Sequence, residues 1–180
     1  MIGQTVWRCV IVMECRLDRP LREVTPRLPV QIGLLTADEL GPYTRFRPDQ
    51  DLSVIRRRLE QGHRCFVVWH QGGIVHAGWA AVQHAWIEYL RAAFPLEAGD
   101  VYQFDSYTAP AFRGLDLAAA RISWMARFAR DAGFRRLVAV VWPKNTPAFR
   151  PLEKAGYQRC GRMCVLRVGP WRRVFYSRLN

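Results

Sequence analysis

A run of residues in the second half of the chain has the pattern of an anion-binding turn. The segment 101–108 is rich in strand-forming residues, Pro110 ends it, and Arg113-Gly114 precedes an apolar stretch with helical spacing. A helix that begins at a glycine turn presents unpaired backbone N–H groups and the positive end of its dipole, so this turn suits a phosphate. The dinucleotide fingerprint and the Walker loop do not match, because they need three glycines or Gly-Lys-Ser/Thr.

Three ionisable residues near this turn are candidates for moving protons. Asp105 lies inside an otherwise apolar strand, where a carboxylate must be paired, protonated or functional. Pairing with a neighbouring arginine or tyrosine explains it as well as a catalytic role does. His76 and His84 lie on another expected strand, where lone histidines are more often satisfied core residues than bases.

With a second motif, the turn resembles the GNAT superfamily of N-acetyltransferases. In that family a strand ending in Val-x-Pro is followed by Arg-Gly-x-Gly-x-Gly/Ala and a helix, which correspond here to 108–110 and 113–118. Further on, 145–148 and 153–157 resemble the family's Asn-x-x-Ala and Lys-x-Gly-Phe segments. Each piece is weak alone, but their order and separation make the match fairly specific. The resemblance covers roughly residues 28–180, most securely 100–158.

The resemblance implies direct attack by a primary amine, of a small molecule or a protein, on the thioester of acetyl-CoA. Backbone N–H groups of the strand would hold the pantetheine and polarise the carbonyl, and the turn amides would take the pyrophosphate. Asp100 stands where one branch of the family has a glutamate base, and as a shorter carboxylate it would act through water. The catalytic candidates are therefore Asp100 and Asp105. The implied cofactor-binding residues are Phe104, Ser106, Tyr107, Thr108, Arg113, Gly114, Leu115, Asp116, Leu117, Ala118 and Asn145.

Two positions depart from the family pattern. Leu152 stands where many members have a tyrosine that acts as general acid, so a water would have to replace it. Asp116 replaces the second glycine, and a carboxylate facing a pyrophosphate would repel it. An aspartate in the first turn of a helix is favoured by the dipole. We therefore expect Asp116 to point outward, and Asp116→Gly to leave CoA affinity nearly unchanged.

The expected fold class is α/β (α+β), with a GNAT-like mixed, mostly antiparallel sheet of about seven or eight strands and helices on both faces. We expect one domain over 1–180, consisting of an N-terminal strand and link (1–27), an acceptor-side half (28–99), an acyl-CoA-binding core (100–158) and a C-terminal hairpin (159–180). The expected strands are 6–16, 30–35, 64–69, 74–87, 101–108, 137–142, 157–168 and 171–179. The expected helices begin at 36, 48, 115 and 146.

The segment 88–99 has no clear period and is interpreted as an insertion. Insertions at this place often shape an acceptor site, which makes Trp86, Glu88 and Tyr89 candidates, although surface packing explains them more simply.

Composition adds an anionic ligand or partner to these expectations. The net charge is +12, and only Lys144 and Lys154 among the 27 basic residues are lysines. Arginine suits phosphate, but codon bias and a basic surface explain the charge equally well. The five cysteines lack zinc-site spacing and are expected to be reduced, mostly buried thiols, so no metal is predicted. Without a leader or a membrane-length apolar window, a cytoplasmic protein with no membrane partner is expected.

Two other functions stay open. A non-catalytic GNAT-like module would bind an acyl-CoA without turning it over, which the residues at 116 and 152 favour. A basic nucleic-acid-binding protein would use the charge, but the arginines are scattered and no nucleic-acid motif is recognised, so nucleic acid is a weaker prediction. The sequence also leaves a homodimer open.

Overall fold

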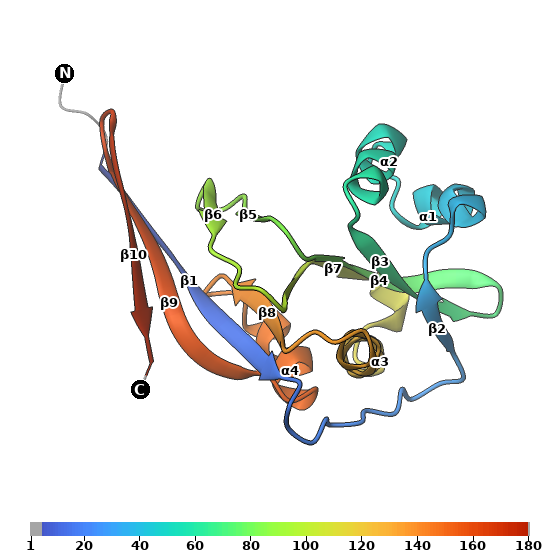
Figure 1. The fold of residues 1–180 in the computed structure, drawn as a ribbon. Helices are drawn as coiled ribbons and strands as arrows, with labels where there is room; N and C mark the ends of the chain where they lie inside the picture. Colours follow the sequence, from blue (N-terminus) through green and yellow to red (C-terminus); the bar gives the residue numbers. More distant parts are fainter. Residues whose placement is uncertain (1–4, 180) are drawn as a thin grey trace.

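The fold is built on one large sheet (Figure 1), and the computed structural model describes residues 5–179. Neighbouring strands run antiparallel, except for one parallel pair formed by residues 100–103 and 136–139. This confirms the predicted mixed, mostly antiparallel sheet. In their order across the sheet, the eight strands are β10 (Trp171–Arg178), β9 (Gln158–Val168), β1 (Thr5–Arg16), β8 (Arg136–Val141), β7 (Asp100–Thr108), β4 (Gly73–Ala81), β3 (Arg64–His70) and β2 (Gln31–Leu34).

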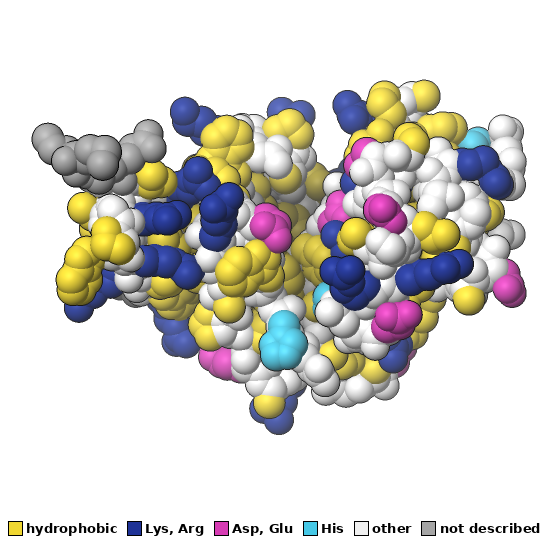
Figure 2. Space-filling model, turned by 90° about the horizontal axis from the view of Figure 1, so that it is seen from above, with side chains coloured by type: hydrophobic (Ala, Val, Ile, Leu, Met, Phe, Trp, Pro, Cys, Tyr) yellow, Lys and Arg dark blue, Asp and Glu magenta, His cyan; other side chains and the backbone are white. Residues whose placement is uncertain are grey.

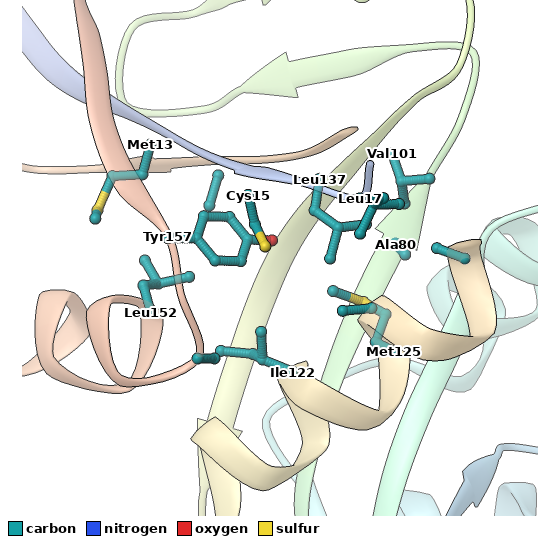
Figure 3. Packing of buried hydrophobic residues seen from close by; sticks show 14 of the residues in the cluster. Met13, Cys15, Leu17, Ala80, Val101, Ile122, Met125, Leu137, Leu152 and Tyr157 are labelled. Carbon is teal, nitrogen blue, oxygen red and sulfur yellow. The ribbon is translucent and has the colours of Figure 1, made fainter. Parts of the chain in front are cut away.

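Helices cover both faces of the sheet, as predicted. On one face, Ile122 and Met125 pack with Leu137 of the sheet in an apolar cluster (Figure 3). On the other face, Tyr43 and Ile55 belong to a second cluster, close to one end of the sheet (Figure 1). The first face carries α3 (Leu117–Asp131) and α4 (Thr146–Lys154), and the second carries α1 (Leu40–Phe46) and α2 (Leu52–Glu60); η1 (Ala37–Glu39) and η2 (Pro110–Phe112) are short 3-10 helices.

A small hairpin on the same face as α1 and α2 was not predicted. It consists of β5 (Ala85–Ile87) and β6 (Ala92–Phe94), so the expected strand 74–87 ends at Ala81 and the expected insertion 88–99 contributes a strand. Ile87 and Phe94 are buried in a cluster with strand residues of the main sheet. Three-residue strands are too short for an alternating pattern to be recognised.

Two of the cysteines contradict the prediction of reduced thiols. Cys9 and Cys164 form a disulfide, while Cys15 and Cys65 are free and buried, and Cys160 is free and partly buried. The reason is the register of β1 against β9, which places Cys9 directly opposite Cys164. These two residues are 155 positions apart in the sequence, so spacing gave no indication of the pairing.

Candidate active site

The two parallel strands at the centre of the sheet separate beyond their first residues. β7 pairs with β8 over 100–103. On its other side, the register against β4 shifts between Ala77 and Trp79, and Asp105 takes a left-handed backbone with φ of 47°. A bulge of this kind bends a strand and increases its twist. The remainder of β7, residues 104–108, therefore turns away from β8 and has no strand partner on that side among the described residues.

A cavity of about 980 Å³ occupies the opening between β7, β8, the start of α3 and α4. Ten of the eleven predicted cofactor-binding residues line it, all except Leu115, which packs beside an apolar cluster. A second group of lining residues comes from the end of β8 and from α4 and its approach; these residues were not assigned to cofactor binding from the sequence, although several lie in the two family-like segments or at the general-acid position. That group includes Val140, Thr146, Ala148, Arg150, Leu152 and Lys154.

The turn before α3 has the geometry expected of an anion site. Gly114 has φ of +79°, and a side chain built on it would meet no other atom within 4 Å, so this backbone is open. Asp116 is also left-handed, with φ of 61°, and α3 begins only at Leu117, two residues later than predicted. A residue with a left-handed backbone cannot continue a right-handed helix, so Asp116 ends the turn and stands before the helix. The first N–H groups of α3, which have no partner within the helix, therefore lie at the cavity, directly after the open turn.

Asp116 lines the cavity and is paired with two cations. Its carboxylate lies 2.7 Å from Lys154 Nζ and 3.1 Å from Arg27 Nε. The hydrogen bond from Lys154, assisted by Arg27, holds the pKa of Asp116 below its ordinary value. Asp116 is the N-cap residue of α3 and not a residue of its first turn, and its side chain accepts no cap hydrogen bond. Two cations instead neutralise the carboxylate beside the proposed anion site.

Asp105 lines the cavity, and it is paired. Its carboxylate accepts hydrogen bonds from Arg58 Nη1 at 2.6 Å, Gln50 Nε2 at 2.6 Å and Arg47 Nη1 at 3.1 Å. Burial favours a higher pKa for Asp105, but the bonds from Arg58 and Gln50 and the charge of Arg47 outweigh it, so the pKa lies below its ordinary value. The interpretation of Asp105 as an arginine-paired carboxylate therefore agrees with the structure.

The structure does not bring Asp100 to the cavity. Asp100 is 3% exposed at the start of β7, and it accepts hydrogen bonds from Arg136 Nε at 2.9 Å and Arg136 Nη2 at 2.6 Å. The backbone N–H of Glu97 donates a third bond to it. Arg136 also bonds Glu14, which ties β1, β7 and β8 together at this end of the sheet.

Leu152, at the position of the family's tyrosine, is 4% exposed, lines the cavity and packs in the core (Figure 3). The nearby Tyr157 does not replace the missing hydroxyl. Burial raises the pKa of Tyr157 well above its ordinary value, and its hydroxyl has no hydrogen-bond partner within residues 5–179. Tyr157 is not among the cavity-lining residues of the described chain. Asn145 does line the cavity, immediately before α4.

The molecule is hollowed between two lobes on the side that carries α1, α2 and the β5–β6 hairpin (Figures 1 and 2). Acidic side chains are visible on both walls of this hollow, with basic side chains around its rim (Figure 2). Trp86 is 52% exposed on β5, and Tyr89 contacts Trp142 with ring centroids 5.9 Å apart. The β5–β6 hairpin and its turn thus carry exposed aromatic side chains.

One comparison with known proteins identifies a family. The family model described as Acetyltransferase (GNAT) family matches residues 34–157. No curated protein matches the sequence. Within residues 5–179, no helix combines the length and apolar character of a membrane span, and no cluster of His, Cys, Asp or Glu could hold a metal ion.

Solved structures share the fold at low sequence identity. The aminoglycoside N-acetyltransferase AAC(6')-Iy, solved with a bisubstrate analogue of CoA, has a TM-score of 0.58 and 16% identity over 73% of this chain and 92% of its own. A GCN5-related N-acetyltransferase from Sphaerobacter thermophilus has a TM-score of 0.61 and 16% identity over 99% of this chain and 52% of its own. An acetyltransferase from Novosphingobium aromaticivorans has a TM-score of 0.59 and 14% identity over 100% of this chain and 77% of its own.

Proposed function

Because the chain belongs to the acetyltransferase (GNAT) family, we propose that it transfers an acetyl group from acetyl-CoA to a primary amine of a small molecule or a protein. The observation that carries this proposal is the cavity between the diverging strands β7 and β8, which continues to the open turn before α3. A ligand in this cavity meets unpaired strand backbone at one end and helix N–H groups at the other. Acetyl-CoA has a peptide-like arm and a pyrophosphate, which match these two ends.

The chain's own groups would hold acetyl-CoA in three places. Backbone N–H groups of residues 104–108 would bond the pantetheine, and one of them would polarise the thioester carbonyl. The backbone of residues 113–118 would receive the pyrophosphate, with Arg113, Arg150 and Lys154 supplying positive charge. Asn145 would face the pantetheine or the attacking amine. No metal takes part in this proposal.

The acceptor would enter from the hollow between α1–α2 and the β5–β6 hairpin. Its neutral amine attacks the thioester carbon, the C–S bond then breaks, and CoA leaves as a thiolate. Arg47, Arg58 and Gln50 occupy both oxygens of Asp105, and its pKa is lowered, so it is a poor base and the amine loses its proton to water. With Leu152 at the acid position, water also protonates the thiolate. Asp100 keeps a structural role, because Arg136 occupies both of its oxygens.

A direct test measures acetyl transfer to a panel of amines. Purified protein is incubated with acetyl-CoA and polyamines, an aminoglycoside, free amino acids or lysine-containing peptides, and the products are weighed by mass spectrometry. We expect at least one amine to gain an acetyl group, with release of one CoA per product. Binding of acetyl-CoA without any transfer to the panel would reject the catalytic proposal.

That second outcome corresponds to the other candidate function, an acyl-CoA-binding module without turnover. The observation that favours it is the chemistry of the cavity wall. Of the lining residues in the described part of the chain, none is histidine or cysteine, and Leu152 supplies no acid. The module and the enzyme share the acetyl-CoA site and differ only in the acetylated product.

The pH dependence of transfer should be that of the acceptor. Asp105 and Asp116 both have pKa values below the ordinary range, so both are ionised throughout the neutral range. The group that titrates is then the amine itself. We expect kcat/KM to rise by about tenfold per pH unit up to the pKa of the amine, with no inflection between about pH 5 and 8. A bell-shaped profile centred near neutrality would reveal a titrating base that this account lacks.

Replacing Asp116 with glycine should increase the affinity for acetyl-CoA by about threefold. The reason is that a surface cation released from its ion pair can contribute about 0.3–1 kcal/mol to the binding free energy of the phosphates. The change releases Lys154 from its ion pair beside the anion site. Glycine also accepts the left-handed backbone at this position without strain. Asp116→Asn is the matched control, since asparagine tolerates the same backbone and removes only the charge. Calorimetric titration should show a gain for both variants, and unchanged affinity in both would refute the electrostatic explanation.

A further inference from the structure

A guanidinium group is buried directly behind the cavity-lining strand without a balancing negative charge. Arg121 of α3 is 0% exposed. Its Nη1 donates to Gln103 Oε1 at 3.1 Å and to Met125 Sδ at 3.5 Å, its Nη2 to Ser106 Oγ at 3.4 Å, and its Nε to His76 Nε2 at 3.3 Å. Within residues 5–179, these acceptors are neutral groups and none is a carboxylate. Burying a charge that has only neutral partners costs folding free energy. This cost suggests that the charge has a function.

His76 contributes to this network as a neutral ring. Burial, together with the charge of Arg121, keeps the pKa of His76 well below its ordinary value. Because Nε2 accepts from Arg121, Nδ1 must carry the hydrogen and donate to Thr108 Oγ1, 2.8 Å away. Arg121 is thereby connected to Gln103, Ser106 and Thr108, which are all β7 residues that line the cavity.

The local backbone is arranged to accommodate this guanidinium. Gly78 of β4 lies against it, and a side-chain carbon at that position would be 2.6 Å from Nη2. The register shift of β7 against β4 occurs at the same place. In a regular strand, residues 103 and 106 would face opposite sides. The bulge at Asp105 turns Ser106 to the same side as Gln103, so that both reach Arg121.

The guanidinium keeps its charge at neutral pH. Burial lowers the pKa of Arg121 to about 10, which still leaves it protonated under physiological conditions. In a low-dielectric interior, a fixed charge acts strongly on groups across a single strand. The strand between Arg121 and the cavity is the segment whose amides would meet the thioester.

We propose that Arg121 is a positioning residue for acyl transfer, which fixes the cavity-facing side of β7 and supplies positive charge behind the bound thioester carbonyl. This inference rests on the proposed function. When the amine attacks, negative charge develops on the thioester oxygen, and charge that is already in place stabilises it without reorganisation. The cost of burying Arg121 is then offset when the transition state forms. Gln103 and Ser106 transmit this effect, because the guanidinium does not itself line the cavity.

Three variants separate this role from simple packing. Arg121→Met removes the charge and keeps much of the side-chain length. Arg121→Lys keeps the positive charge but loses the planar guanidinium group with its fixed set of N–H donors. The double variant Arg121→Met with Gly78→Ala returns a methyl group to the vacated space, which restores packing without restoring charge. The φ angle of Gly78 is not positive, so alanine can adopt the same backbone conformation.

The readout is the carbonyl stretching band of bound acetyl-CoA, isotopically labelled at its thioester carbonyl carbon and measured by difference infrared spectroscopy. Calorimetry gives the affinity for acetyl-CoA, and thermal unfolding gives stability. Wild-type protein and Arg121→Lys should shift the band to lower wavenumber than free acetyl-CoA. Arg121→Met and the double variant should move it back toward the free value, while acetyl-CoA affinity changes by less than about threefold, as expected for an interaction realised mainly in the transition state.

The outcomes distinguish this inference from the proposed function. If wild-type protein binds no acetyl-CoA, the proposed function fails and this inference fails with it. If it binds acetyl-CoA but the band is the same in wild type and in a folded Arg121→Met or double variant, only this inference is overturned. Recovery of both stability and band position in the double variant would likewise show that Arg121 is needed only for packing.

Discussion

Replacing Ala118 with glutamate should lower the affinity for acetyl-CoA by about 100-fold, equal to about 2.7 kcal/mol. Ala118 is the second residue of α3 and lines the cavity next to the open turn. A glutamate there fills space that the pyrophosphate would occupy, and it repels the phosphate charges. The helix itself should tolerate the change, because an acidic residue near a helix N-terminus interacts favourably with the dipole.

Ala118→Gln is the matched control for this effect, since it has nearly the same shape and no charge. It should lose less affinity than Ala118→Glu, and the difference should shrink as salt is added, because salt screens the repulsion. Both variants should melt within a few degrees of wild type. Wild-type affinity in folded Ala118→Glu would place the pyrophosphate elsewhere.

Replacing Arg136 with leucine should reduce the free energy of unfolding by about 3 kcal/mol, the lower end of the cost of breaking a buried ion pair. The lower end applies because the Arg136 side chain is 20% exposed while that of Asp100 is 4% exposed. The variant leaves the Asp100 carboxylate buried without its main partner. Urea denaturation at neutral pH measures the loss.

Removing both partners is the control for this prediction. The double variant Arg136→Leu with Asp100→Leu should be more stable than Arg136→Leu alone, because the buried carboxylate of Asp100 is no longer left unpaired, and the loss of the bond to Glu14 is common to both variants. In the folded fraction, acetyl-CoA should still bind, since Asp100 does not line the cavity. If the double variant is no more stable than the single one, desolvated Asp100 is not the source of the loss.

The residues assigned from the sequence to the turn and the preceding strand nearly all line the cavity. The turn at Arg113-Gly114 and the strand before it were recognisable because their signals are contiguous: strand-forming residues, a proline, a glycine and a helical period. Ten of the eleven cofactor-binding residues assigned from the resemblance line one cavity for this reason. The order of the main strands and helices followed from the same kind of local pattern.

The remaining features depend on long-range register, which local patterns do not encode. Alternation placed Asp105 within a regular strand, and the bulge at this residue became visible only once β7 was paired with β4. The ion pair between Asp116 and Lys154 and the pairing of Asp100 with Arg136 both join separate elements. From its charge alone, Arg121 would be expected on the solvent-facing side of α3, but it is fully buried. Its partners on β4 and β7 provide acceptors that helical spacing cannot reveal.

Hydrogen exchange with and without acetyl-CoA, followed by mass spectrometry, tests both the ligand and its location. Backbone amides exchange more slowly when they are bonded to a ligand or shielded by it. We predict that acetyl-CoA slows exchange in residues 104–108 and 113–118 and near the start of α4, and leaves the β9–β10 hairpin unchanged. Unchanged exchange in 104–118 at saturating acetyl-CoA, or protection confined to another part of the chain, would contradict the assignment of this cavity as the acyl-CoA site.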